Sequence, residues 1–215
     1  MIELKNVSIS YKDKQILDKV SIEIPNSGIN FLMGKNGSGK TTLIKCLLNF
    51  MDYEGEIETN CKRHNIREIF VIFDDSSLYK ELTGLENIMQ FTSCKKKTAL
   101  EFSQPYLSGD LLNKKAKTYS YGERKKIFLI MVEILKPKII IMDEVSNGLD
   151  YETMLLLKKR FIDLSKNSLI LMTGHQFEFY KNIVSRVFVI NNKTITKVEI
   201  MENESLENIY EQTIL

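Results

Sequence analysis

The chain has 215 residues, of which 43% are hydrophobic and 27% charged, and its formal net charge is +2 at neutral pH. This length suits one domain with a substantial core, and the composition is that of an ordinary globular protein. The near balance of charge argues against a nucleic-acid partner, because nucleic-acid binders carry a larger or more clustered basic excess. No apolar run approaches the roughly 18 residues that span a bilayer, and the N-terminus lacks a signal-peptide pattern. Three scattered cysteines favour a reduced, cytosolic protein.

Short strands are predicted within residues 1–33, at IELKNVSIS, VSIEI and INFLM, with turns between them. A helix follows from about residue 40, since Leu43, Leu47 and Met51 fall at i, i+4 and i+8 on one face. Another strand is predicted at IFVIF, residues 69–73. Beyond it, the strand signals stop and the composition becomes polar and rich in lysine, which indicates a small helical insertion.

Between the third strand and the helix lies GKNGSGKTT, which fits the pattern Gly-x-x-x-x-Gly-Lys-Thr. The glycines let the backbone curl with its amide hydrogens pointing inward, and the positive end of the following helix faces the same spot. We expect Lys40 to reach the outer phosphates of a nucleotide and the Thr41 hydroxyl to bind Mg²⁺. A glycine-rich turn that binds nothing is the alternative, and the correct flanking elements argue against it. The residues expected at this nucleotide site are Gly34, Lys35, Asn36, Gly37, Ser38, Gly39, Lys40, Thr41 and Thr42.

Three unbroken apolar runs mark the second half of the chain, in IIIMDE (139–144), SLILMT (168–173) and RVFVI (186–190). Such runs are typical of strands buried on both faces, as in a parallel sheet covered by helices. Helices are predicted at about 122–135 and in ETMLLLKKRFIDL, with Asp150 as N-cap of the second. The tail after residue 190 indicates a final strand and an amphipathic helix. The chain is therefore predicted to be an α/β protein with a helical insert.

Polar residues follow two of these buried strands, where open α/β sheets place their ligand sites. Asp143 is suited to hold Mg²⁺, and Glu144 to orient an attacking water. His175, one of two histidines, is placed to hydrogen-bond a γ-phosphate. Acids that merely end a strand and a structural histidine are the alternatives, and the phosphate loop upstream favours the functional interpretation.

Taken in order, the phosphate loop, YSYGE (119–123), IIIMDE, NGLD (147–150) and the strand-end histidine resemble the nucleotide-binding subunit of an ATP-binding cassette (ABC) transporter. The resemblance covers about residues 2–190. It implies a P-loop NTPase fold, namely an ABC ATPase core with a mainly parallel sheet flanked by helices and an N-terminal antiparallel β subdomain. It also implies that Tyr11 stacks on adenine, that Asp143 is the Walker B aspartate, and that Glu144 and His175 are the catalytic carboxylate and the switch histidine.

The signature of this family, usually Leu-Ser-Gly-Gly-Gln, completes the ATP site of the other subunit. Here Ser120, Gly122 and Glu123 occupy signature positions, and Tyr121 replaces a glycine. Ser120 and Gly122 are expected to donate to a γ-phosphate from the start of a helix. The tyrosine-serine-x-glycine form resembles cassettes of bacterial drug and bacteriocin exporters.

Two further departures from the family pattern affect coupling. Asp74 stands where the family usually has the glutamine of the Q-loop, and it is expected to approach Mg²⁺. The segment 87–119 is shorter than in familiar members. We therefore expect one ABC ATPase domain over 1–215, with a shortened helical subdomain at 78–135.

The resemblance implies a Mg²⁺-dependent ATPase, active as a dimer, that powers a separate integral membrane permease. Its cofactors would be ATP and Mg²⁺, and its partners the permease and a second cassette, identical or different, with no nucleic acid. It would lie in the cytoplasm, on the inner face of the membrane through the permease. Export of a drug, peptide or bacteriocin-like cargo is preferred over import on the YSYGE form alone.

A soluble ABC-type ATPase of an assembly or regulatory complex is the main alternative, since its motifs would look the same. A switch GTPase is disfavoured, because the nearest string to its guanine-reading motif, at residues 113–116, lacks the aspartate. A chromosome-maintenance ATPase is disfavoured too, because no sustained heptads separate Lys40 from Asp143.

Overall fold

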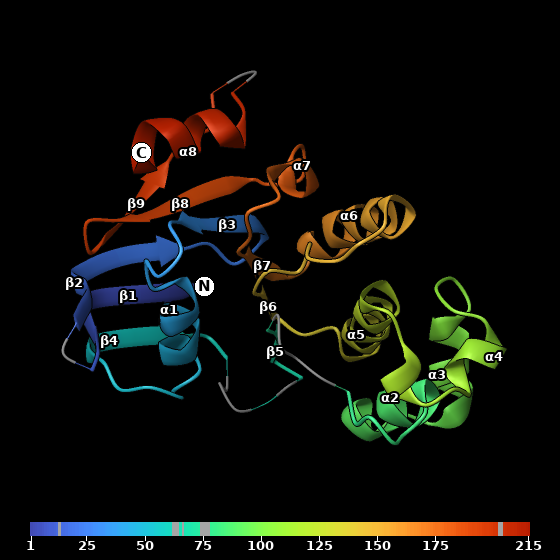
Figure 1. Cartoon of the computed structure of the whole chain (residues 1–215). Helices are drawn as coiled ribbons and strands as arrows, with labels where there is room; N and C mark the ends of the chain where they lie inside the picture. The colour runs from blue at the N-terminus through green and yellow to red at the C-terminus, as the bar shows by residue number, and fades with distance from the viewer. Residues whose placement is uncertain (13, 62–64, 66, 74–77, 202–203) are drawn as a thin grey trace.

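The computed structural model describes residues 1–12, 14–61, 65, 67–73, 78–201 and 204–215. Within these residues the chain forms two sheets (Figure 1). The smaller is antiparallel, in the order β2-β1-β4, and comprises β1 (Ile2–Tyr11), β2 (Lys14–Ile24) and β4 (Glu54–Thr59). It confirms the expected N-terminal antiparallel β subdomain.

The larger sheet has six strands in the order β5-β6-β7-β3-β8-β9, parallel throughout except for the last pair. Its strands are β3 (Gly28–Gly34), β5 (Ile69–Ile72), β6 (Ile139–Met142), β7 (Leu169–Met172), β8 (Arg186–Asn191) and β9 (Thr194–Val198). The mainly parallel sheet predicted from the apolar runs is thus confirmed. Parallel pairing brings the carboxyl ends of β3, β6 and β7 to one edge of the sheet.

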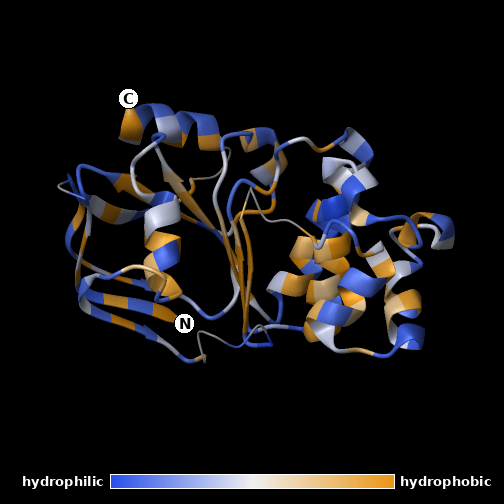
Figure 2. Cartoon of the chain, turned by 60° about the horizontal axis from the view of Figure 1, so that its bottom comes forward, coloured by the Kyte–Doolittle hydropathy of each residue, from blue (hydrophilic) through white to orange (hydrophobic). Residues whose placement is uncertain are grey.

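The strand cores alternate between two apolar clusters that lie on opposite faces of this sheet. Ile140 and Ile170 belong to one cluster, and Ile141 and Leu171 to the other. Because both faces are covered, every residue of β6 and β7 is buried, which explains why these strands read as continuous apolar runs. Figure 2 shows the contrast with the smaller sheet, whose strands alternate between hydrophobic and hydrophilic residues.

Some helices cover the large sheet, and others form a separate group. The helices are α1 (Lys40–Leu47), α2 (Gly84–Thr92), α3 (Lys96–Ser103), α4 (Gly109–Leu112), α5 (Tyr121–Leu135), α6 (Tyr151–Ser165), α7 (Phe177–Tyr180) and α8 (Leu206–Ile214), with a 3₁₀ turn at Ala116–Thr118. Figure 1 shows α2–α5 gathered away from the small sheet. Among the described residues, no helix combines the length and apolar character needed to cross a bilayer.

One predicted detail is wrong. Met51 does not belong to the first helix, because α1 ends at Leu47 and Asn49 turns the chain with φ 57°. Met51 still packs against the same apolar cluster, so the helical spacing reflected burial in the turn rather than a continued helix. By contrast, the N-cap role of Asp150 is confirmed, since its carboxylate accepts from the Thr153 amide at 2.8 Å.

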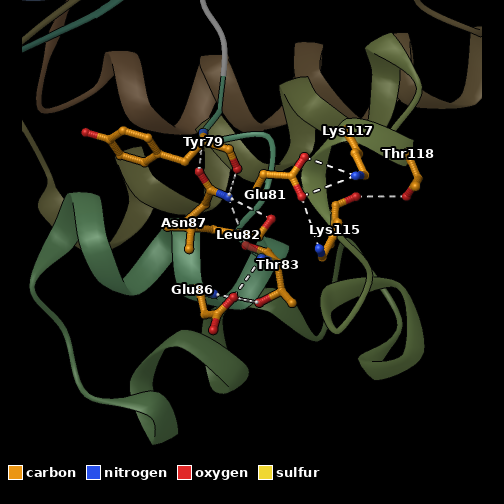
Figure 3. A network of polar contacts seen from close by, with 9 residues as sticks. All are labelled: Tyr79, Glu81, Leu82, Thr83, Glu86, Asn87, Lys115, Lys117 and Thr118. Carbon is orange, nitrogen blue, oxygen red and sulfur yellow. Dashed lines mark hydrogen bonds and ion pairs between the residues drawn. The ribbon is translucent and has the colours of Figure 1, made fainter.

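Buried Asn87 fixes the segment that enters α2 (Figure 3). Its Oδ1 accepts from the Tyr79 amide at 2.8 Å, and its Nδ2 donates to the carbonyls of Tyr79 and Thr83 at 3.1 and 2.9 Å. Thr83 also forms a capping box with Glu86. With a longer bond from Nδ2 to the Leu82 carbonyl at 3.4 Å, one side-chain amide thus binds four backbone groups of the turn before α2.

The same turn is tied to the strand-like segment that leads into α5. The Ala116 amide donates to the Leu82 carbonyl at 2.8 Å, and the Glu81 carboxylate receives the ammonium groups of Lys115 and Lys117 at 3.0 Å each (Figure 3). Exposed ion pairs of this kind contribute little on their own. The backbone bonds therefore hold the entry to α2 against the entry to α5.

Asn87→Ala is expected to lower the free energy of unfolding by about 2–3 kcal/mol, because it leaves buried backbone groups without partners. Urea denaturation of the variant measures this difference. Asn113→Ala, at an exposed asparagine of the same helical group, is the matched control and should shift stability by no more than about 0.5 kcal/mol. Equal stabilities of the two variants would contradict the role given to Asn87.

Candidate functional site

The glycine-rich loop joins β3 to α1 at the carboxyl edge of the large sheet. Gly37 and Gly39 have φ values of 76° and 105°, a region that residues with a side chain rarely adopt. A Cβ on Gly39 would lie only 2.1 Å from Cγ2 of Ile16 in β2. The loop therefore needs glycine at 39 for its backbone angle and for its packing against the small sheet.

Lys40, the first residue of α1, is folded back over this loop. Its Nζ donates to the carbonyls of Gly34 and Lys35 at 2.7 and 3.1 Å. Burial lowers the pKa of the Lys40 ammonium, and the carboxylates of Glu144 and Asp143 partly oppose that shift. A cation thus lies within a concavity formed by the backbone.

The concavity also holds an orphaned hydroxyl. Among the described residues, Ser38 Oγ is buried without a hydrogen-bond partner. A buried hydroxyl normally has a partner, so an unpaired one in this glycine-rich loop, close to Gly34, is consistent with a loop that binds a phosphate oxygen. The residues of the loop are therefore suited to the nucleotide phosphates that the sequence predicted.

Asp143 follows β6 and lies between two threonine hydroxyls. Thr41 Oγ1 donates to its Oδ2 at 2.7 Å, and the Thr173 hydroxyl donates to its Oδ1. Asp143 is 5% exposed. A carboxylate and a hydroxyl are the hard oxygen ligands that Mg²⁺ prefers, so Thr41 and Asp143 fit that ion together with phosphate oxygens. Thr173 escaped the sequence analysis, although it directly follows β7, the strand next to β6.

Glu144 is held in an unfavourable backbone conformation with φ 55°. Its amide donates to the carbonyl and the hydroxyl of Thr173, both at 3.2 Å. Left-handed φ in a residue with a side chain persists where neighbours hold it, and it is frequent at functional sites. The carboxylate is thereby directed from the end of β6 toward the loop that follows β7.

His175 lies in the loop after β7, and its Nε2 is 3.4 Å from Glu144 Oε1. Burial, and next the Lys40 ammonium, lower the pKa of the imidazole below its usual 6.5. The neutral form of the ring is therefore favoured near pH 7. The two residues predicted to be catalytic are brought together.

A cavity of about 360 Å³ opens beside these groups and is lined by Lys40, Thr41 and Glu144 but not by Asp143 or His175. Tyr11, at the end of β1, is 52% exposed and lies at its edge, so the structure places this aromatic ring beside the loop. Lys14 and Ile16 of β2 are further lining residues that the sequence analysis missed. The lining also includes Asn36, Gly37, Gly39, Lys40, Thr41, Thr42 and Glu144. The predicted ligand Asp74 lies outside the described residues.

The signature residues lie elsewhere, at the start of α5, and do not line this cavity within the described part of the chain. Ser120 Oγ accepts from the Glu123 amide at 3.2 Å, and the Ser120 amide donates to the Glu123 carboxylate at 2.7 Å. This reciprocal capping box fixes the first turn of α5. Gly122 is buried against Asp150, so the signature packs on the loop before α6.

Comparison with known proteins identifies the family. A family model described as ABC transporter matches residues 17–147 of the chain. The chain belongs to the ABC transporter family. The resemblance of its motifs is thereby confirmed, and the chain is an ATPase of the ATP-binding subunit type.

Relatives and solved structures agree with this ABC ATPase assignment. The chain is 28% identical to Methionine import ATP-binding protein MetN of Clostridioides difficile, over 97% of this chain and 71% of that protein. It is 26% identical to Lantibiotic transport ATP-binding protein SrtF of Streptococcus pyogenes, over 100% of this chain and 98% of that protein.

An ATP-binding subunit of an ABC transporter has the same fold, with a TM-score of 0.81 at 23% identity, over 99% of this chain and 92% of that one. A dimeric ATP-binding cassette bound to ADP and Pi gives a TM-score of 0.75 at 23% identity, over 94% and 100%. The predicted P-loop NTPase fold with an ABC ATPase core is thus confirmed.

The proximity of Lys40 and His175 predicts a measurable shift. In a His64→Gln background, the single remaining imidazole should titrate by NMR below the ordinary pKa of 6.5. Lys40→Met should raise that pKa, because it removes a nearby positive charge. Lys45→Met, at an exposed position of the same helix, is the control and should leave it unchanged.

The same pKa sets a pH dependence of stability. The folded chain binds the imidazole proton less readily than the unfolded chain, so the free energy of unfolding should fall as the pH drops below about 6.5. His175→Gln should remove that component. An NMR pKa above 6.5 for His175 in the nucleotide-free protein would contradict the described site.

Proposed function

We propose that this ABC ATPase binds ATP with Mg²⁺, hydrolyses it as a dimer, and powers a separate integral membrane permease. The observation that carries the catalytic part is the 2.7 Å contact of Thr41 with Asp143. It joins the phosphate loop to the carboxylate at the end of β6, beside Lys40 and Glu144. The contact supports a metal–phosphate site formed by two segments that lie far apart in the sequence.

The residues of the cavity divide the work of phosphoryl transfer, which consists mainly of positioning and charge neutralisation. Lys40 and the loop amides hold the outer phosphates, and Tyr11 contacts the adenine. Thr41 and Asp143 hold Mg²⁺, which neutralises charge on the phosphates when bound. Asp74 is proposed to approach the same ion.

Glu144 and His175 act on the reacting end of the nucleotide. The Glu144 carboxylate accepts a hydrogen bond from the attacking water and orients it toward the γ-phosphate. His175 has an N–H in either protonation state of its ring, and it donates that N–H to the γ-phosphate.

A second subunit completes the site. Ser120 and Gly122 lie outside the cavity of their own chain, so we propose that they contact the γ-phosphate bound by the other cassette, as in the family pattern. The amide end of α5 suits an anion. Glu123 caps that helix. The second cassette is either an identical chain or a different one.

The cassette lies in the cytoplasm and binds the permease at the inner face of the membrane. Export of a drug, peptide or bacteriocin-like cargo is favoured by the YSYGE signature, and the lantibiotic transport relative supports it. The methionine import relative represents the opposite direction. We propose that a shortened helical subdomain at 78–135 provides the docking surface for the permease.

Glu144→Gln is expected to lower ATP turnover by on the order of 10²-fold or more, because it removes the group that accepts the proton of the water. Binding of ATP, followed by fluorescence of an ATP analogue, should remain within about threefold of the unmodified chain. Glu152→Gln, at an exposed position of α6, is the control and should hydrolyse ATP normally. Turnover by Glu144→Gln at the normal rate would rule out this role.

Lys40→Ala should abolish measurable ATP binding, since it removes the one buried cation of the loop region that the structure describes. The same fluorescence titration measures it. Unchanged affinity would contradict the phosphate site, and a circular dichroism melt of the variant separates lost binding from lost folding.

A pull-down tests the transport part. Glu144→Gln is expressed with a tag in its native host and recovered in mild detergent with and without ATP. Recovery of a stoichiometric integral membrane protein supports the permease and identifies the subunit that selects the cargo. Recovery of soluble proteins alone, or of none, while the unmodified chain still hydrolyses ATP, would replace transport with the assembly or regulatory role.

A further inference from the structure

Tyr121 stands where the family signature has a glycine, and its side chain is held although it is 54% exposed. The Arg124 guanidinium lies over the ring, with its Cζ 4.5 Å from the ring centroid. The backbone of Gly148 packs against the base of the same side chain. A Cβ built on Gly148 would lie 3.1 Å from both Cβ and Cγ of Tyr121. The Tyr121 side chain thus lies between Arg124 of its own helix, α5, and the backbone of Gly148.

Gly148 belongs to the loop 144–150, and its backbone has φ 69°. A side chain here would strain the backbone and crowd Tyr121 as well. A second contact runs alongside, since a Cβ on Gly122 would lie 3.3 Å from Oδ2 of Asp150. The signature therefore packs against the loop 144–150 of the same chain at two adjacent positions, Tyr121 and Gly122.

The loop 144–150 begins with Glu144, and its conformation is set from two sides. On the sheet side, Thr173 binds the Glu144 amide and Tyr180 lies 3.3 Å from the Ser146 hydroxyl. Within the loop, the Asn147 amide donates to the Glu144 carbonyl at 3.3 Å. On the signature side, Tyr121 packs on Gly148. Because φ of Glu144 is unfavourable, its position depends on these contacts.

We propose that Tyr121 is a positioning residue for Glu144. Its ring transmits the position of the signature, through Gly148 and the turn 144–147, to the carboxylate of the same chain. The inference rests on the proposed function, in which the signature faces ATP bound by the other subunit. Occupancy of one site would then set the geometry of Glu144 in the other.

Mixed dimers test this separately for each chain. Two differently tagged chains are combined and purified on both tags, with Glu144→Gln in one of them. A single active site then remains, built from the intact Glu144 of one chain and the signature of the other. Tyr121→Gly is placed either on the chain that keeps Glu144 or on the chain that carries Glu144→Gln.

On the chain that keeps Glu144, Tyr121→Gly should lower kcat at least about tenfold and leave KM for ATP within about twofold, because a misplaced catalytic group loses rate rather than binding. On the other chain it should leave kcat and KM within about twofold, since glycine is the usual signature residue there. A larger effect on the other chain would mean that Tyr121 acts on the nucleotide directly, and it would overturn the proposal. No effect on either chain would overturn it as well.

Two control variants test whether the effect is specific to the Tyr121 ring. Tyr121→Phe on the chain that keeps Glu144 should retain the normal kcat, because the ring and not the hydroxyl contacts Gly148. Tyr151→Gly removes a comparably exposed tyrosine from the first position of α6 and should also retain it. If the Tyr121→Gly chain does not fold, Tyr121→Ala, a better helix former, carries the same expectation.

Failure of the proposed function gives a different result. It appears in the reference dimer, in which both chains keep Tyr121, as an absence of ATP hydrolysis or of a recoverable dimer. The inference about Tyr121 fails only when that reference is active and the two placements of Tyr121→Gly do not differ as stated.

Discussion

Parallel pairing of β6, β7 and β3 is the constraint on which the site depends. Their register aligns Met142 with Met172 and Met172 with Phe31. The three strands therefore end at the same edge of the sheet. The residues that come next are Asp143 and Glu144 after β6, Thr173 to His175 after β7, and the phosphate loop after β3. Hydrogen bonds from the Thr41 and Thr173 hydroxyls to the Asp143 carboxylate then join segments that are 102 and 30 residues apart.

The same sheet determines the electrostatics of the site. Because its strands are buried on both faces, the charged groups at their ends are partly removed from water, and burial penalises charge. Burial lowers the pKa of both Lys40 and His175, and the carboxylates of Asp143 and Glu144 oppose the shift for Lys40. Two carboxylates lie beside one buried ammonium, so the proposed Mg²⁺ would offset their repulsion of an anionic nucleotide.

Much of this arrangement could be predicted from the sequence, because the apolar runs and the polar residues that follow them are local features of the sequence. Unbroken apolar runs followed by polar residues identified the buried strands and the edge where Asp143, Glu144 and His175 lie. The roles of Thr173, Ile16 and Asn87 could not be predicted, since each depends on a neighbour that the sequence does not indicate: Asp143, Gly39 and the turn before α2. Met51 shows the converse error, in which helical spacing continued past the end of α1. The contact of Tyr121 with Gly148 also requires two loops to meet in space.

Two interpretations of the signature prove compatible in chemical terms. Ser120 and Glu123 form a capping box, which a purely local analysis would take as a helix start and nothing more. In that box the Ser120 oxygen accepts a hydrogen bond from the Glu123 amide, so its own O–H remains available to donate. Glu123 directs its carboxylate to the Ser120 amide, and the Arg124 guanidinium lies one residue further on. The cap therefore holds Ser120 in place at the amide end of α5 and leaves free the hydrogen that the proposed contact with a phosphate in the other subunit would use.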